Sequence, residues 1–210
     1  MTRGPLPIAV VHLDESCLGN GKPGDNPGGA GALVEVRGRA GIERRDLYLH
    51  SPATTNNRMA LSGAIATLQL LGQKRKRLRV LMVSDSEYLV RGVREWLPGW
   101  IARNWTRKGG PIENLELWRS LWQSLALHET QLTWVRGHAG HPKNEYANDL
   151  AIRAATTQET SAGLAASSFT QWLAVRQQRG AFRGYDADAA FDAVAARVAS
   201  GQPLAHAEEA

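Results

Sequence analysis

IAVVHLDESCLGN, residues Ile8–Asn20, is the stretch on which the expected fold depends. It begins as an apolar, β-branched run, which predicts a buried strand, and reaches Asp14 just before a turn of small and polar residues. An ionised carboxylate is rarely buried unless it is paired or binds a metal ion, so Asp14 is a candidate metal ligand. The alternative is that Asp14 starts an ordinary turn, since Asp followed by Ser and Gly is common in turns.

The composition indicates a globular protein with a mild basic excess. The 210 residues are 43% hydrophobic and 21% charged, which suits one domain with an appendage. Lys and Arg number 25 against 20 Asp and Glu, and the net charge of +5 slightly favours polyanionic partners. The single cysteine, Cys17, excludes an intrachain disulfide and favours a reducing compartment. No apolar run is long enough for a membrane span, so we expect a cytoplasmic protein without membrane association.

Alternation and turn signals further along the chain predict an antiparallel meander, then strands that alternate with helices. The glycine-rich run Gly19–Gly31 is expected to be a loop. The fourth predicted strand ends at a second carboxylate, Asp85. The remaining predicted strands are Ala32–Arg37, Leu47–His50, Val80–Ser84 and Gln131–Val135, and the helices are Arg58–Leu71, Ser86–Trp96, Glu113–His128 and one opening near Pro142.

A tryptophan-rich segment follows the fourth strand. Trp96, Trp100 and Trp105 stand among arginines and Lys108, and the segment contains Pro98 and leaves through a Gly-Gly-Pro sequence. Aromatic residues at near-helical spacing usually form core, but their mixture with cations favours a protruding element that contacts nucleic acid.

Two regions near the C-terminus carry weaker signals. His138 and His141 lie in a glycine-rich loop, but no cysteine or third histidine lies nearby, which disfavours zinc. After Ala162 the chain is alanine-rich, and Phe169–Gln178 and Asp186–Ala199 are predicted as amphipathic helices. We therefore expect a main domain over residues 1–158 and a helical extension over residues 159–210 with a disordered end. The extension is a candidate for binding a partner or for self-association of an otherwise monomeric protein.

Four segments in the same order resemble the ribonuclease H type 1 family. LDESCLGN resembles its first-strand signature, TTNNRMAL the opening of its first helix, SDSEYLV the exit of its fourth strand, and WVRGHAGHPKNEYANDLA its last loop and helix. The tryptophan-rich segment is similar to the basic handle of the bacterial members. The resemblance covers about Ile8–Ala155 and implies an α/β fold. In the fold that the resemblance implies, a five-stranded mixed sheet has three antiparallel strands followed by two parallel ones and is flanked by helices.

The family binds two Mg²⁺ ions between four acidic side chains and cleaves the RNA strand of RNA/DNA hybrids. The resemblance implies that Asp14 and Asp85 are metal ligands and that His138 assists proton transfer. It also implies substrate contacts by Asn20, Asn56 and Asn57, by Thr55 in a DNA phosphate pocket, and by Trp96, Trp100 and Trp105 in the handle.

Two of the four family acids are absent from this chain. Ala60 stands where the family has Glu, and Asn148 stands where it has Asp, so Asn148 offers only a neutral carbonyl oxygen. Acids are gained nearby at Glu15, Glu87 and Asp149, which are solvated surface residues in the simplest interpretation. Our hypothesis is that Glu15 fills the space vacated at Ala60 and serves as a catalytic metal ligand with Asp14, Asp85 and Asn148.

Three interpretations of this altered site compete. The first is a divergent metal-dependent endoribonuclease that uses Mg²⁺, with Mn²⁺ as a substitute for a depleted site. The second is a protein that binds RNA/DNA hybrids but has lost cleavage, and the third is an enzyme disabled on purpose. Integrase and resolvase nucleases, which share the fold, are disfavoured by the TTNNR and GHAGHP segments.

Overall fold

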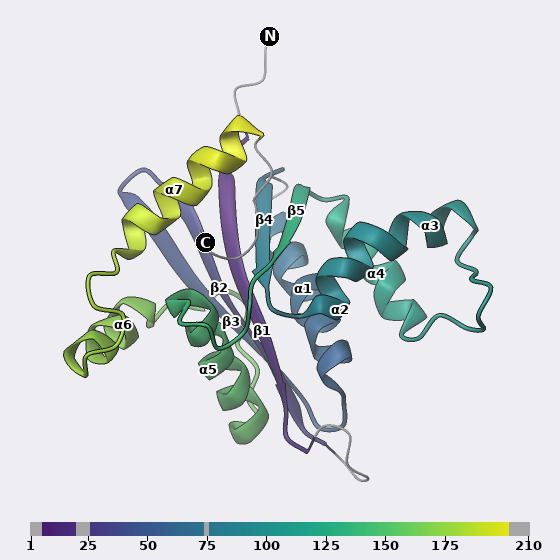
Figure 1. Cartoon of the computed structure of the whole chain (residues 1–210), viewed down its shortest axis with the longest axis horizontal. Helices are drawn as coiled ribbons and strands as arrows, with labels where there is room; N and C mark the ends of the chain where they lie inside the picture. Colours follow the sequence, from purple (N-terminus) through teal and green to yellow (C-terminus); the bar gives the residue numbers. More distant parts are fainter. Residues whose placement is uncertain (1–5, 20–25, 74–75, 202–210) are drawn as a thin grey trace.

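A mixed six-stranded sheet forms the centre of the computed structural model, which describes residues 6–19, 26–73 and 76–201 (Figure 1). The strand order is β5-β4-β1-β2-β3-β6. β1, β2 and β3 pair antiparallel, and β4 and β5 follow in parallel beside β1, so the predicted arrangement is confirmed. The strands are β1 (Ile8–Cys17), β2 (Gly28–Gly38), β3 (Gly41–Ser51), β4 (Arg79–Ser84), β5 (Glu129–Trp134) and β6 (Ala165–Ala166).

The sixth strand, β6, was not predicted. It consists of two residues that pair antiparallel with β3, a length at which no alternation pattern can be recognised. Asn20 and the expected disordered end, residues 203–210, lie outside the described residues. Among the residues that are described, no helix is both long and apolar enough to cross a bilayer.

Helices α1 (Asn56–Gly72) and α4 (Leu115–Leu125) cover one face of the sheet. Thr55 caps α1, because its side chain accepts a hydrogen bond from the backbone N–H of Arg58. Side chains of α1 pack on the β1 residues that face this side, which include Ala9, Val11 and Leu13. The packed α1 residues are Ala60, Leu61, Ala64 and Leu68.

Helices α5 (Pro142–Thr157) and α7 (Ala187–Ser200) cover the opposite face (Figure 1). Because both faces of β1 are buried, its sequence is a continuous apolar run rather than an alternating one. From α7, Phe191, Val194 and Val198 pack against Val10 and Leu81 of the sheet. The C-terminal helices were predicted as an appendage, and that prediction is wrong for α7, since its apolar side completes this layer of the core.

Helix α6 (Phe169–Gln178) joins this layer by packing on α5. Phe169 and Leu173 of α6 are buried against Tyr146 and Leu150. The Tyr146 hydroxyl donates to Asp46 Oδ2 at 2.5 Å, and the backbone N–H of Ser168 donates to the same oxygen at 3.1 Å. These contacts connect β3 and α5 of the main domain to the residue before α6 in the extension.

Two glycines of β2 allow α5 to approach the sheet closely. A Cβ at Gly29 would overlap the carbonyl oxygen of Ala151, and a Cβ at Gly31 would overlap that of Ala147. Both glycines fall in the run predicted as a loop, but β2 begins at Gly28. The glycine content here therefore reflects a close helix–sheet contact and not a turn.

A protrusion extends away from the sheet between β4 and α4 (Figure 1). It contains α2 (Glu87–Arg91), a π-helical turn η1 (Gly92–Trp96), α3 (Leu97–Ala102) and the loop that leads back to α4. Trp118 of α4 is fully buried at its base, and a Cβ at Gly92 would overlap the Trp118 ring. The predicted protruding element is therefore present and is fixed to the core by Trp118.

Candidate active site

Asp14 lies within β1 rather than at its end, because the strand continues to Cys17. The prediction that the strand runs out at Asp14 is therefore wrong. The side chain is 5% exposed, and its Oδ1 accepts a hydrogen bond of 2.7 Å from the Glu15 N–H. A buried carboxyl in the middle of a paired strand does not start a turn, so the site interpretation of Asp14 is the one that the geometry favours.

Asp85 directly follows β4 and emerges beside Asp14. Leu13 pairs with Ser84 across the two parallel strands, which brings the next residue of each strand together. Gly137, in the loop before α5, lies so close that a Cβ there would overlap Asp85 Oδ2. Asp85 is therefore confined between the end of its own strand and this loop.

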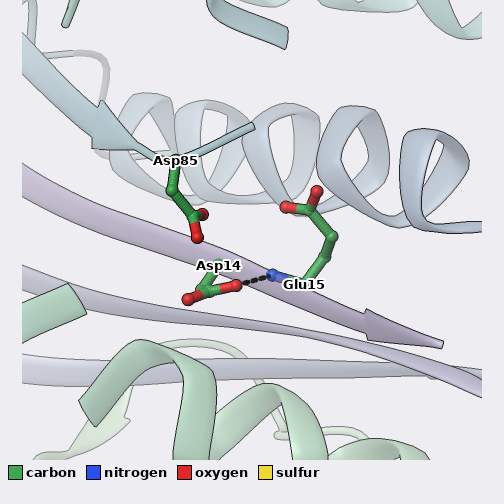
Figure 2. A group of neighbouring side chains, drawn as sticks. All are labelled: Asp14, Glu15 and Asp85. Atoms are coloured by element: carbon green, nitrogen blue, oxygen red, sulfur yellow. Dashed lines mark hydrogen bonds between the residues drawn. The ribbon is translucent and has the colours of Figure 1, made fainter. Parts of the chain in front are cut away.

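Glu15 completes a cluster of three carboxyl groups (Figure 2). Asp14, Glu15 and Asp85 each offer an oxygen, and these atoms lie within 4.8 Å of one another. Glu15 points to the side of β1 that faces α1, where Ala60 is fully buried and contributes no polar group. Glu15 Oε2 is buried and has no hydrogen-bond partner among the described residues.

The three carboxyl groups hold their protons more tightly than usual. Burial, with the charges of Asp85 and Glu15, raises the pKa of Asp14 to about 8. Burial and the charge of Asp85 raise the pKa of Glu15 to about 8, and burial also raises the pKa of Asp85. Like charges in a poorly solvated cluster cause such shifts, and a divalent cation would remove them by compensating the charge.

Asn144, which the sequence analysis did not single out, holds the two aspartates. It is 2% exposed, and its Nδ2 donates to Asp14 Oδ2 at 3.2 Å. Its side-chain hydrogen bonding lowers the pKa of both Asp14 and Asp85 relative to burial alone. The only sequence signal was its position four residues before Asn148, which places both amides on one face of α5.

Asn148 itself is half-buried one turn further along α5. The neighbouring Asp149 points elsewhere and accepts hydrogen bonds from Trp172 Nε1 at 2.7 Å and from Arg176 at 2.9 Å. Glu87 is exposed and lies 3.9 Å from Arg91. Of the three gained acids, only Glu15 is in the cluster, and Glu87 and Asp149 are surface acids that pair with arginines.

His138 lies at the rim of the cluster, in the loop between β5 and α5. It is exposed and has a left-handed backbone, with φ of 54°. His138 directly follows Gly137, which lies against Asp85, and the charge of His138 lowers the pKa of Asp85. An exposed imidazole at the edge of a carboxylate cluster can deliver or remove a proton there.

The predicted substrate residues occupy two regions. Thr55, Asn56 and Asn57 are at the start of α1, where Thr55 is exposed and the two asparagines are half-buried. In the protrusion, Trp100 is only 8% exposed, with its ring 5.4 Å from that of Trp118.

The other two predicted tryptophans, Trp96 and Trp105, are half-buried. The ring of Trp96 lies 5.9 Å from that of Trp100, and the ring of Trp105 lies 5.9 Å from that of Trp122. The tryptophan rings therefore pack mainly against one another, and Trp100 offers little ring surface to a ligand.

Comparisons with known proteins agree with this geometry. The family profile described as RNase H matches residues 7–156. The chain is 43% identical over 153 residues to Ribonuclease H of Granulibacter bethesdensis, which covers 72% of this chain and 95% of that protein. It is also 43% identical over 145 residues to Ribonuclease H of Pseudomonas paraeruginosa, which covers 69% and 90%.

A solved structure gives the same result. The crystal structure of LC9-RNase H1, described as a type 1 RNase H with the type 2 active-site motif, is 49% identical with a TM-score of 0.76. The match covers 82% of this chain and 83% of that one. The chain therefore belongs to the ribonuclease H family, and it is a ribonuclease H-type hydrolase.

Proposed function

We propose that the chain cleaves the RNA strand of RNA/DNA hybrids, with Asp14, Asp85, Glu15 and Asn148 holding Mg²⁺. The observation that carries this proposal is the convergence of three carboxyl groups with oxygens within 4.8 Å of one another. Carboxylate and amide oxygens are the ligands that Mg²⁺ prefers, and the unpartnered Glu15 Oε2 is an oxygen available for it.

The charge of this cluster also suits the proposal. Three carboxylates neutralise three of the four positive charges of two Mg²⁺ ions, and a bound phosphodiester supplies further negative charge. Glu15 thereby replaces in charge the acid that is missing at Ala60. LC9-RNase H1, to which this chain is similar, is described as a type 1 RNase H with the type 2 active-site motif. This description supports a site with an alternative set of acids over a site that has lost its acids.

When bound, Mg²⁺ would activate water and stabilise the leaving oxygen. The chain's own residues have separate roles. Asn144 orients Asp14 and Asp85 by hydrogen bonding, and Gly137 leaves room for the Asp85 carboxylate. His138, exposed at the rim, would transfer a proton at the leaving group.

Substrate contact is proposed for the start of α1 and for the protrusion. Thr55 is exposed at the N-terminus of α1, where the positive end of the helix dipole suits a phosphate. Asn20, Asn56 and Asn57 would contact the hybrid, with the 2′-hydroxyl distinguishing its RNA strand. In the protrusion, Trp96 and Trp105 have more exposed surface than Trp100 and are the better candidates for contact.

The proposal is tested by cleavage of a labelled RNA/DNA hybrid in Mg²⁺ and then in Mn²⁺, with duplex RNA and duplex DNA as controls. We expect cleavage of the hybrid alone and a loss of roughly a hundredfold or more in Glu15→Gln. Glu87→Gln is the matched control, because it makes the same chemical change at an exposed position outside the cluster.

The competing function is hybrid binding without cleavage. In that case the wild-type protein would retain the hybrid in a binding assay and leave it intact in both metals. Cleavage that appears only after Ala60→Glu with Asn148→Asp would support this alternative and contradict ours. We further propose that the protein is cytoplasmic and monomeric. Light scattering of the purified chain measures its molar mass in solution and so tests whether it is a monomer.

A further inference from the structure

A ring of charged side chains lies beneath the first turn of α7, on the face of the sheet that carries α5. Its centre is Glu35 of β2, which is fully buried. Glu35 Oε1 lies 2.9 Å from Arg44 Nε, and Glu35 Oε2 lies 2.7 Å from Lys143 Nζ. Lys143 is only 3% exposed, so this is an ion pair inside the protein and not on its surface.

The first turn of α7 closes the ring from above. Lys143 Nζ donates to the backbone oxygen of Ala187 at 3.1 Å, and Arg44 donates to Asp188 at 2.5 Å. Asp186 caps the same turn by accepting from the N–H groups of Asp188 and Ala189. The start of α7 is thus bound to Glu35 through two cations, one from β3 and one from α5.

Lys143 stands next to Asn144, and this adjacency connects the ring to the carboxylate cluster. Lys143 is in the first turn of α5, where a positive charge opposes the helix dipole. A lysine at this position therefore gains nothing from its own helix, and its stabilising partners are Glu35 and Ala187. Because Lys143 and Asn144 are consecutive residues of the first turn of α5, the contacts of Lys143 also restrain the backbone from which Asn144 donates to Asp14.

We propose that Lys143 is a positioning residue, held between Glu35 and the first turn of α7, which fixes Asn144 against Asp14 and Asp85 and thereby sets the affinity for the divalent cation. This role rests on the proposed function of the cluster. Through Lys143, the C-terminal extension would contribute to the geometry of the active site, although no residue of α7 belongs to the carboxylate cluster.

The test compares Lys143→Met with Arg79→Met. Arg79 donates to the backbone oxygens of Val198 and Ala199, at 3.2 and 3.4 Å, and so holds the last turn of α7. It lies at the start of β4, at the opposite end of that strand from Asp85. Each variant therefore removes one cation that binds the α7 backbone, but only one of these cations adjoins Asn144.

The readout is the dissociation constant for Mn²⁺, measured by calorimetry without nucleic acid. We expect it to rise about three- to tenfold in Lys143→Met, less than the 10–100-fold typical for a direct partner of a metal ligand. We expect less than a twofold change in Arg79→Met. Equal weakening in the two variants, or no weakening in Lys143→Met, would overturn the proposal.

A double variant, Glu35→Gln with Lys143→Met, separates positioning from stability. Lys143→Met alone leaves the buried Glu35 carboxylate paired only with Arg44, whereas the double variant removes that carboxylate and leaves Arg44 paired with Asp188. We expect the melting temperature to recover in the double variant while Mn²⁺ binding stays weak. Recovery of both together would show that Lys143 acts only through stability and would refute the proposal.

Hybrid cleavage by the wild-type protein distinguishes this inference from the proposed function. If the wild type binds Mn²⁺ but does not cleave, the proposed function fails and the comparison of metal affinities still decides the role of Lys143. In the cleaving enzyme we expect Lys143→Met to raise the Mg²⁺ concentration for half-maximal rate, with KM for the hybrid unchanged.

Discussion

Asp14→Asn should stabilise the metal-free protein at pH 8 and not at pH 4. The Asp14 pKa is about 8 in the folded protein against 3.8 for the free side chain, so folding favours its protonated form. The associated stability is fully present below pH 4 and is lost as the pH rises through about 8. At 1.36 kcal/mol for each pKa unit, the loss amounts to about 5 kcal/mol by pH 8.

Asparagine removes this pH-dependent cost because it is never ionised, but two effects reduce the gain. It can keep only one of the two hydrogen bonds that Asp14 accepts, from Glu15 N–H and from Asn144, and a lost bond costs about 1 kcal/mol. Removing the Asp14 charge also lets Glu15 ionise more easily, and Glu15 then bears part of the same cost. We therefore expect a net gain of about 2 kcal/mol, or 4–8 °C in melting temperature.

The assay is thermal unfolding in EDTA at pH 4 and pH 8, with Glu87→Gln as an exposed control. The wild-type protein should also gain stability at pH 8 when Mg²⁺ is added, while Asp14→Asn gains less. A variant that melts no higher than the wild type at pH 8, or one equally stabilised at both pH values, would refute the electrostatic reasoning.

Gly137→Ala should lower the hybrid cleavage rate by about tenfold while the fold persists, because a Cβ there overlaps Asp85 Oδ2; steady-state kinetics and circular dichroism check this. Trp118→Ala should cost about 3–5 kcal/mol in urea unfolding, since the ring is fully buried, whereas Trp122→Ala, with a residue 43% exposed, should cost far less. His138→Ala should slow cleavage about a hundredfold and leave hybrid binding intact, as measured by single-turnover rates and a binding titration; unchanged rates would remove His138 from proton transfer.

The sheet and the meeting of Asp14 with Asp85 could be predicted because both depend on local signals. An apolar run followed by a carboxylate occurs twice in the sequence, and the parallel pairing of β1 with β4 brings Asp14 and Asp85 together even though β1 continues to Cys17. Helical spacing puts Leu61, Ile65, Leu68 and Leu71 on one face of the predicted first helix. Leu61 and Leu68 are buried, and Ile65 and Leu71 are half-buried. These features need only the periodicity of a strand or helix.

What could not be predicted depends on contacts between distant segments. Asn144 looks like any polar residue in a first helical turn until α5 is placed over β1. The role of α7 was missed because an amphipathic pattern does not tell which surface the helix covers. The Val10 side of the sheet is buried by α7, and this contact accounts for the buried Phe191. Trp100 was expected to contact ligand, and its burial follows from the position of Trp118, eighteen residues later.

The direct contact of α5 with β2 has a consequence for engineering. Gly29 and Gly31 meet the α5 backbone with no side chain between, so the separation of helix and strand is set by main-chain atoms that cannot change rotamer. Core substitutions elsewhere should therefore relax without shifting Asn144 or Asn148 along β1. An acid introduced at position 148 would therefore keep the distance between α5 and β2 unchanged. Any larger residue at Gly29 or Gly31 would instead displace the whole of α5.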